Sequence, residues 1–387
     1  MRSFIRIACF LLMLLFVVAC GAQSAAPESA AQPTSEPAAP TEAPVEEESV
    51  VFANETPEPA EPVETFEPLP TEEPTPAPTE TPTPEPTETP EPTRAPLPGE
   101  IAVNFPDYDT GVDADYSYQS DNLRIAITVH EETMKDHLNR KLKETYYVAD
   151  IWIRSLNSFR LAFSKGEYGK GSEEPETLAL RENAIFAVNG NYNQGLTLES
   201  GVLQHNWRRN KGWNSCAIGV LYKDGSFKSF RLTKEVFDLD KELKNGAWHA
   251  WQFGPIVIRN GEEGPGATEY HNMGYKARNI LGYYEPGHYV IMTCDNRGKD
   301  AQGMNEYMMV DIMKSLGVKE AFNLDGGTSA VMVFMGKIIN HPTLRTDDGK
   351  SVVGRPIVDM LVFGEYDENG NSPDLSTLTP AKFKGRD

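Results

Sequence analysis

Cysteine is scarce in this chain, with four residues in 387. Cys9 and Cys20 belong to the N-terminal segment, which leaves Cys216 and Cys294 for the folded part. No pair has the short spacing of a zinc or redox motif, so we expect neither a metal nor another cofactor. In an exported protein the last two cysteines could form one disulfide, and two buried thiols fit their apolar surroundings equally well.

Long hydrophobic runs are also lacking after the first twenty residues, so no second membrane span is expected. The one apolar run, Phe10 to Val18, follows two arginines and is short for a membrane span, as in a secretory signal segment. It closes with Ala19 directly before Cys20, which resembles a bacterial lipobox. We therefore expect residues 1–20 to be a lipoprotein signal peptide, with acylated Cys20 anchoring the chain in the cell membrane on its extracytoplasmic face. The alternative is an ordinary cleaved signal peptide with an incidental cysteine.

Basic residues are nearly absent from Gly21 to Gly99. This stretch holds 17 glutamates, 20 of the chain's 29 prolines and a single basic residue, Arg94. Such a composition cannot bury a core and favours extended, solvated, self-repelling chain. We expect residues 21–99 to be a disordered acidic stalk that acts as a spacer. No nucleic-acid partner is expected for a chain with a net charge of −21.

About 288 residues remain from Glu100 onward, enough for one large domain. One amphipathic helix is predicted from Met304 to Leu316, ending at Gly317, and the polar stretch Glu131 to Leu142 predicts a loop or a short helix. Because strands outnumber helices without alternating regularly with them, the expected fold class is α+β, a mixed β-sheet with packed helices. Apolar runs predict strands within 123–129, 146–153, 185–188, 215–222, 227–232, 256–258, 287–294 and 358–363.

The most informative stretch is Asn323-Leu324-Asp325-Gly326-Gly327-Thr328-Ser329. It stands between the predicted helix and a strand-like run, Ala330 to Phe334, so one carboxylate followed by two glycines lies at a corner. Glycine reaches backbone angles that other residues adopt only at a cost, and it lets a ligand approach the main chain. Taken alone, Asp-Gly predicts a hairpin turn. The rest of the chain favours a site.

Other polar residues stand beside glycines at predicted strand ends. Together with Phe253-Gly254-Pro255, they resemble the phosphodiester glycosidase family from about Ala179 to Gly364. The pattern departs at Thr328, Met308 and Asp359, where the family commonly has glycine or serine, glutamate and asparagine. The elements that carry the resemblance are Asn189-Gly190-Asn191-Tyr192, Arg278-Asn279-Ile280-Leu281-Gly282, Asp295-Asn296-Arg297, Asn323 to Ser329, and Gly354-Arg355-Pro356.

The resemblance implies a glycosidase that cleaves a sugar from a sugar-1-phosphodiester. It implies a phosphodiester glycosidase domain over 173–366, between a β-rich N-terminal extension (100–172) and a C-terminal tail (367–387). Asp325 is the expected reactive carboxylate, as nucleophile or general acid/base. Glycoside hydrolysis usually employs two carboxylates, and the candidates for the second are Asp295, Glu199 and Glu306. Phosphate leaves more readily than a sugar alkoxide, so acid assistance is less needed.

The expected substrate-binding residues divide by the group that they would contact. Arg278 and Arg355 suit a phosphate through forked, charge-assisted hydrogen bonds. Asn189 and Asn323 suit sugar hydroxyls, since an amide both donates and accepts. His271 is a weaker candidate for a catalytic role. The set is completed by Gly190, Tyr192, Gly326, Gly327 and Ser329, with the amides of the last two glycines as further donors.

We therefore expect an extracytoplasmic hydrolase that acts on, or transfers a sugar from, a phosphoglycan or another sugar-phosphate at the cell surface. Two other classes of protein fit the same sequence. One is a non-catalytic glycan-binding lipoprotein that uses the same pocket. The other is a scaffold or adhesin whose partner surface is formed by Trp207, Trp213, Trp248 and Trp251.

Overall fold

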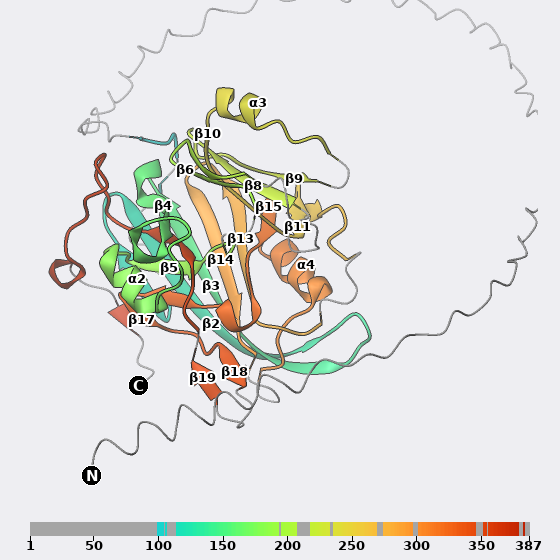
Figure 1. Cartoon of the computed structure of the whole chain (residues 1–387). Coiled ribbons are helices and arrows are strands. Elements are labelled where there is room, and N and C mark those ends of the chain that lie inside the picture. The colour runs from blue at the N-terminus through green and yellow to red at the C-terminus, as the bar shows by residue number, and fades with distance from the viewer. Residues whose placement is uncertain are drawn as a thin grey trace, which may run out of the picture. The chain divides into compact units, whose positions relative to one another are not determined.

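The computed structural model describes residues 99–103, 105–106, 114–192, 195–206, 217–232, 235–268, 274–296, 301–345, 351–353, 355–378 and 382–383. All of them lie in one compact unit, Thr87–Asp387 (Figure 1). The expected signal peptide with Cys20, and nearly all of the expected stalk, lie outside the described residues.

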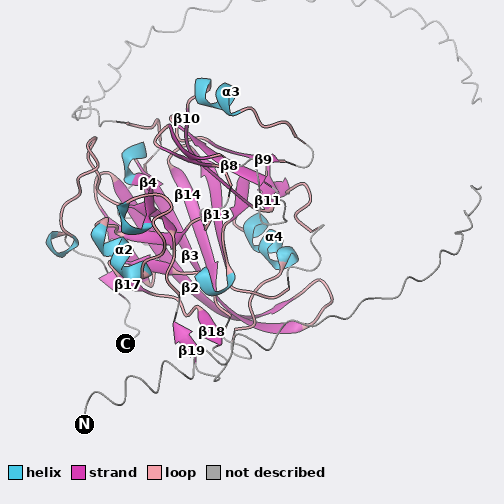
Figure 2. Cartoon of the chain, viewed as in Figure 1, coloured by secondary structure: helices cyan, strands magenta, loops and turns pink. Residues whose placement is uncertain are grey.

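Strands dominate this unit, and the expected α+β class with helices packed on a mixed sheet is wrong (Figure 2). All the strand pairings found in the described ranges are antiparallel. Only one helix there is longer than seven residues. Continuous apolar strands such as Ala217–Tyr222 are buried on both faces. One face of this strand lies in the core that the sheets share, and Leu239 and Leu243 of a short helix pack against the other face, so no layer of long helices is needed.

The largest sheet has nine strands in the order β12-β11-β15-β13-β14-β3-β2-β1-β21. Its longest component is the hairpin of β2 and β3, which pairs Leu123 with Ile153 at one end and Lys135 with Lys141 at the other. The strands are β1 (Tyr116–Gln119), β2 (Leu123–Lys135), β3 (Lys141–Ile153), β11 (Ile256–Arg259), β12 (Glu262–Glu263), β13 (Arg278–Glu285), β14 (His288–Cys294), β15 (Glu320–Asn323) and β21 (Lys382–Phe383).

The polar stretch Glu131 to Leu142, expected as a loop or short helix, instead forms the outer half of that hairpin. Glu131 pairs with Thr145, and Thr133 pairs with Lys143. The prediction was wrong because the side chains at the end of β2 are largely exposed. A hairpin that extends beyond the core keeps its backbone hydrogen bonds while its side chains face water.

Two five-stranded sheets and a two-stranded ribbon complete the unit, in the orders β7-β6-β10-β8-β9, β17-β16-β5-β20-β4 and β18-β19. Phe159, Trp251 and Tyr289 come from three different sheets, yet the Phe159 ring centroid lies 6.3 Å from that of Trp251 and 5.6 Å from that of Tyr289. The three large sheets therefore share one core. The strands are β4 (Phe159–Phe163), β5 (Phe186–Asn189), β6 (Thr197–Glu199), β7 (Val202–His205), β8 (Ala217–Tyr222), β9 (Phe227–Arg231), β10 (Ala247–Phe253), β16 (Met332–Phe334), β17 (Lys337–Ile338), β18 (Thr343–Arg345), β19 (Ser351–Val353) and β20 (Asp359–Phe363).

The segment 100–172, expected as an N-terminal extension, is built into these sheets. It supplies β1 to β4. Strand β3 pairs along the whole of β14, and β4 pairs along β20. The segment is thus part of the same compact unit as residues 173–366.

Three helices are described: α2 (Pro175–Arg181), α3 (Leu239–Lys244) and α4 (Glu306–Ser315). Helix α4 confirms the one predicted from the sequence. Asn305 caps it by accepting the N–H of Met308 at 3.1 Å, and Gly317 follows it at φ +74°. Its methionine-rich face shares a core cluster with β11. None of the helices described here is long and apolar enough to cross a membrane.

Candidate functional site

Asp325 lies where the chain crosses from one sheet to another. Strand β15 pairs with β11 and β13 in the nine-stranded sheet, whereas the next strand, β16, pairs with β5 and β17 in a five-stranded sheet. The connection contains a short 3-10 helix, η4 (Gly327–Ser329). The Asp-Gly pair is therefore a crossing between sheets and not a hairpin turn.

This crossing requires both glycines. A Cβ on Gly326 would lie 2.6 Å from the carbonyl oxygen of Ala277, and Gly327 has φ +63°. The two amides were expected to bind a ligand, but here they serve the protein. The Gly326 N–H donates to Oδ1 of Asp325 at 2.9 Å, and the Gly327 N–H donates to the carbonyl oxygen of Ala277 at 2.7 Å.

The Asp325 carboxylate faces Arg355 and Ser329. Oδ2 of Asp325 lies 3.5 Å from Nη2 of Arg355, and the Arg355 Nε–H donates to the Ser329 hydroxyl at 2.8 Å. The side chains of Asp325 and Arg355 are 17% and 35% exposed. Burial raises the pKa of Asp325, and the contacts from Ser329, Arg355 and the Gly326 N–H oppose that rise. The pair thus combines a largely buried carboxylate with a more accessible guanidinium.

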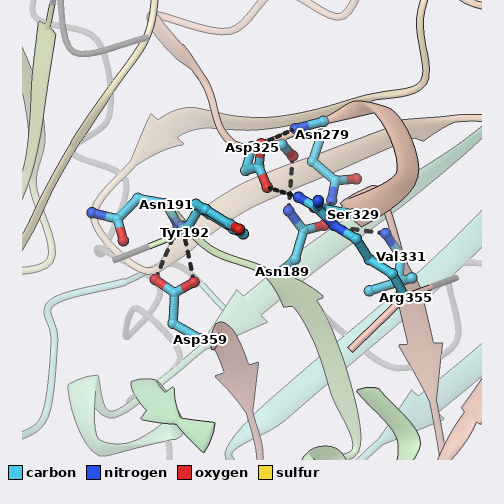
Figure 3. A network of polar contacts seen from close by, with 10 residues as sticks. Asn189, Asn191, Tyr192, Asn279, Asp325, Ser329, Val331, Arg355 and Asp359 are labelled. Atoms are coloured by element: carbon cyan, nitrogen blue, oxygen red, sulfur yellow. Dashed lines mark hydrogen bonds and ion pairs between the residues drawn. The ribbon is translucent and has the colours of Figure 1, made fainter. Parts of the chain in front are cut away.

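Asn189, buried at the end of β5, braces the chain around Asp325 (Figure 3). Its Nδ2–H donates to the carbonyl oxygen of Asp325 at 2.8 Å, and its Oδ1 accepts the Val331 N–H at 3.1 Å and the amide of Asn279. The neighbouring Gly190 carbonyl accepts the Asp325 N–H at 3.0 Å. The Asn189 amide therefore holds the crossing in place, a different task from the sugar contact expected for it.

Tyr192 and Arg355 form the open side of the site. Tyr192 has φ +62° and is 40% exposed, and the Arg355 guanidinium lies 4.9 Å from the centre of its ring. The buried carboxylate of Asp359 accepts the N–H groups of Asn191 and Tyr192, both at 3.0 Å (Figure 3). A Cβ on Gly190 would lie 2.7 Å from that carboxylate. Asp359 thus fixes the backbone that carries Tyr192, a role that the sequence did not indicate.

Arg278 and Asn323, two further expected substrate-binding residues, are buried beneath the crossing, with 3% and 0% of their surfaces exposed. The Arg278 Nε–H and Nη2–H donate to the carbonyl oxygens of Met304 at 3.2 Å and Gly274 at 3.0 Å. Burial lowers the pKa of Arg278. Asn323 Nδ2–H donates to the Gly254 carbonyl at 2.8 Å. Of the two expected phosphate-binding arginines, Arg355 is therefore the accessible one.

The candidates for a second catalytic carboxylate do not present an open carboxylate beside Asp325. Glu199, on β6, lines a cavity of about 320 Å³ together with Arg160 and Trp248, and Asp325 is not among the lining residues. Glu306 begins α4 and is 1% exposed. Asp295 is fully buried after β14.

Asp295 holds a histidine that the sequence analysis missed. Its Oδ1 accepts the backbone N–H of His341 at 2.8 Å and the Asn340 Nδ2–H at 3.3 Å. Its Oδ2 lies 3.6 Å from Nδ1 of His341, whose side chain is 55% exposed. No motif marks His341. Its only signal is this contact with a carboxylate 46 positions earlier in the chain.

Several sequence candidates lie outside the described residues: Cys216, Trp207, Trp213, Arg297, Gly354 and the proposed catalytic His271. Of the other two tryptophans expected in a partner surface, Trp251 is 1% exposed and belongs to the core, and Trp248 is half-buried. In the described ranges, no group of three or more His, Cys, Asp or Glu side chains is placed to hold a metal ion.

A sequence model described as phosphodiester glycosidase matches residues 177–364. The SPbeta prophage-derived uncharacterized protein YomE of Bacillus subtilis (strain 168) is 28% identical over 204 residues. That match covers 51% of this chain and 30% of YomE, so the chain spans less than a third of this relative's length.

A solved zebrafish structure has a similar fold: the catalytic domain of N-acetylglucosamine-1-phosphodiester alpha-N-acetylglucosaminidase, auto-inhibited by its pro-peptide. The TM-score is 0.52 at 23% identity, over 64% of this chain and 84% of that one. The elements that carry the sequence resemblance all fall within 177–364. Those that contain Asn189, Asp325 and Arg355 meet at the crossing between the two sheets. Residues 177–364, within the larger compact unit, are thus similar to the phosphodiester glycosidase family, as the sequence motifs predicted.

Proposed function

We propose that this domain hydrolyses the bond between C1 of a sugar and the oxygen of a phosphodiester, in a cell-surface polysaccharide or phosphoglycan. The family supports a glycosidase that acts on phosphodiester-linked sugars. The sugar-1-phosphodiester linkage and its place in a surface polymer are the proposal.

One observation carries it: the largely buried Asp325 carboxylate and the more exposed Arg355 guanidinium lie 3.5 Å apart. A sugar-1-phosphodiester has an electrophilic C1 directly beside one negative charge. Arg355 can bind that charge with charge-assisted hydrogen bonds, while Asp325 faces C1. The exposed ring of Tyr192, on which Arg355 stacks, offers an apolar face to the sugar.

The protonation state of Asp325 fits this use. Burial raises the pKa of Asp325 and makes the carboxylate more basic, and Arg355 still favours its ionised form. A more basic carboxylate is a better nucleophile or proton acceptor. The phosphomonoester that departs is a good leaving group, so the reaction depends less on a second acid.

The direct test is to incubate the purified full-length chain with a panel of sugar-1-phosphodiesters, including those of N-acetylglucosamine, glucose and galactose. Equal amounts of free sugar and phosphomonoester would support hydrolysis. Binding in calorimetry with no product from any member would instead favour the non-catalytic glycan-binding lipoprotein.

Because Asp359 holds the backbone that carries Tyr192, replacing Asp359 should affect both stability and substrate binding. Asparagine at position 359 offers one acceptor oxygen, so the N–H of either Asn191 or Tyr192 loses its partner. We expect Asp359→Asn to lower the free energy of unfolding by about 1–3 kcal/mol. We also expect a KM raised several-fold with little change in kcat, because Tyr192 is loosened beneath Arg355. Urea unfolding and steady-state kinetics measure both effects.

A matched control is Asp374→Asn, which alters a carboxylate that caps a 3-10 helix near the C-terminal end of the described residues, Leu375–Thr377. It should leave KM unchanged. If Asp359→Asn also keeps the parent's stability and KM, the carboxylate does not hold Tyr192 in place.

We further propose that the chain is a lipid-anchored protein of the extracytoplasmic membrane face. The support is the apolar run that ends at Ala19-Cys20, followed by a proline- and glutamate-rich stretch. Cys20→Ser should abolish incorporation of a labelled fatty acid and leave unprocessed precursor in the membrane fraction. Normal processing of the unmutated chain without any lipid would contradict the anchor.

A further inference from the structure

The site described above contains one reactive carboxylate, whereas hydrolysis through a covalent intermediate also needs a group that takes a proton from water. Asp295, Glu199 and Glu306 do not present an open carboxylate beside Asp325. Among the described residues, hydrogen bonds through Asn340 connect the exposed imidazole of His341 to this region. We propose that His341 is the general base of this reaction and that Asp295 is its positioning residue. This inference rests on the proposed function.

The imidazole has a defined orientation. Its Nδ1 faces the protein, 3.6 Å from Oδ2 of Asp295 and 3.4 Å from the hydroxyl of Tyr147. The opposite nitrogen, Nε2, is therefore on the outward side of a side chain that is 55% exposed. A proton on Nδ1 would face the Asp295 carboxylate and the Tyr147 hydroxyl oxygen, and it would leave the Nε2 lone pair free to accept another proton, as in hydrolases that pair histidine with a buried aspartate. Asp295 can hold this orientation because it is fully buried and its Oδ1 also accepts the backbone N–H of His341.

Hydrogen bonds connect this histidine to the sheet crossing. The adjacent Asn340 donates from Nδ2 to the carbonyl oxygen of Ala330 at 2.9 Å and accepts the Met332 N–H at 2.8 Å. Ala330 is the residue after η4, whose Ser329 accepts from Arg355. The backbone of strand β18, which begins two residues after His341, also lies close to η4. The loop that carries His341 is thus held against the segment that carries the Asp325 contacts.

The chemistry balances in two steps. In the first, the Asp325 carboxylate attacks C1, the bond from C1 to the phosphate oxygen breaks, and the phosphomonoester departs with the electron pair. In the second, water attacks C1 of the glycosyl-enzyme and gives its proton to Nε2 of His341, and the Asp325 carboxylate leaves with its electron pair. Only the second step needs His341, because phosphate requires little acid assistance.

The two steps can be separated with His341→Gln. We expect a burst of about one phosphomonoester per enzyme at near the parent's rate, followed by turnover slowed about a hundredfold. Azide needs no general base, so it should restore turnover at least tenfold and yield a glycosyl azide. Asp295→Asn should show the same burst, a smaller fall in turnover and rescue by azide. This change leaves the His341 imidazole in place but removes the carboxylate that orients it.

His288→Gln is the matched control. It removes a histidine paired with a carboxylate, Asp150, at the opposite end of β14 from Asp295. It should turn over substrate as the parent does. Parent-like turnover by His341→Gln, or a loss with neither burst nor azide rescue, would overturn the assignment. A parent chain that releases no phosphomonoester from any sugar-1-phosphodiester would overturn the proposed function itself, and this inference with it.

Discussion

Replacing Asp325 by asparagine is expected to lower turnover of a sugar-1-phosphodiester by about a hundredfold or more. The change keeps the shape of the side chain and the oxygen that accepts the Gly326 N–H. It removes the negative charge that faces Arg355, and an amide can serve neither as nucleophile nor as proton acceptor. Phosphomonoester and free sugar released by the parent and by Asp325→Asn measure the difference.

The same change should not weaken the fold. Burial raises the pKa of Asp325, so the folded chain holds a proton on this group more readily than the unfolded chain does. For such an acid, the free energy of unfolding falls as the pH rises above the unfolded pKa of about 3.9. Asparagine carries no charge at any of these pH values, so its burial does not lower the free energy of unfolding in this way. The melting temperature of Asp325→Asn at pH 7 should therefore equal or exceed the parent's, as expected where a site trades stability for function.

Asp311→Asn, on the exposed face of α4, makes the same chemical change away from the crossing and should alter neither rate nor melting temperature. Equal rates for Asp325→Asn and the parent would remove Asp325 from the mechanism. The two glycines after it would then be explained by the sheet crossing alone.

The segment 323–329 could be recognised from the sequence as a candidate site because its determinants are local. A capped amphipathic helix, a glycine at its end and a carboxylate before two glycines are all readable from adjacent residues. The order of the polar elements then supplied the family. What local pattern could not supply was which sheet each strand joins, and the α+β expectation was wrong for that reason.

The roles of side chains in the site depend on contacts between residues that are far apart in the sequence. Asn189 and Asp325 are 136 positions apart, and Tyr192 and Asp359 are 167 apart. An asparagine before a glycine reads the same whether its amide meets a sugar or braces the main chain. The burial of Arg278 and the presence of His341 beside Asp295 were hidden in the same way.

Arg355 is expected to be the most sensitive binding residue. Its guanidinium contacts Ser329 and Asp325 through separate N–H groups and stacks on Tyr192. Lysine keeps the charge, but it has neither the planar fork nor the flat face. We expect Arg355→Lys to lower kcat/KM for the phosphodiester at least tenfold, a loss of about 1.4 kcal/mol or more in transition-state binding. Steady-state kinetics at several salt concentrations measure it.

The same change at two other arginines separates loss of phosphate binding from loss of stability. Arg278→Lys should chiefly lower the melting temperature, because that buried guanidinium donates to backbone carbonyls and a lysine would leave one of them without its partner. Arg181→Lys changes an ion pair with Glu173 away from the site and also removes a hydrogen bond to the Phe163 carbonyl, so it should leave kcat/KM unchanged even where it lowers the melting temperature. If Arg355→Lys keeps the parent's kcat/KM, Arg355 does not bind the phosphate. If Arg278→Lys loses activity at an unchanged melting temperature, the anion lies deeper than the Arg355–Tyr192 stack, and the buried arginine reaches it.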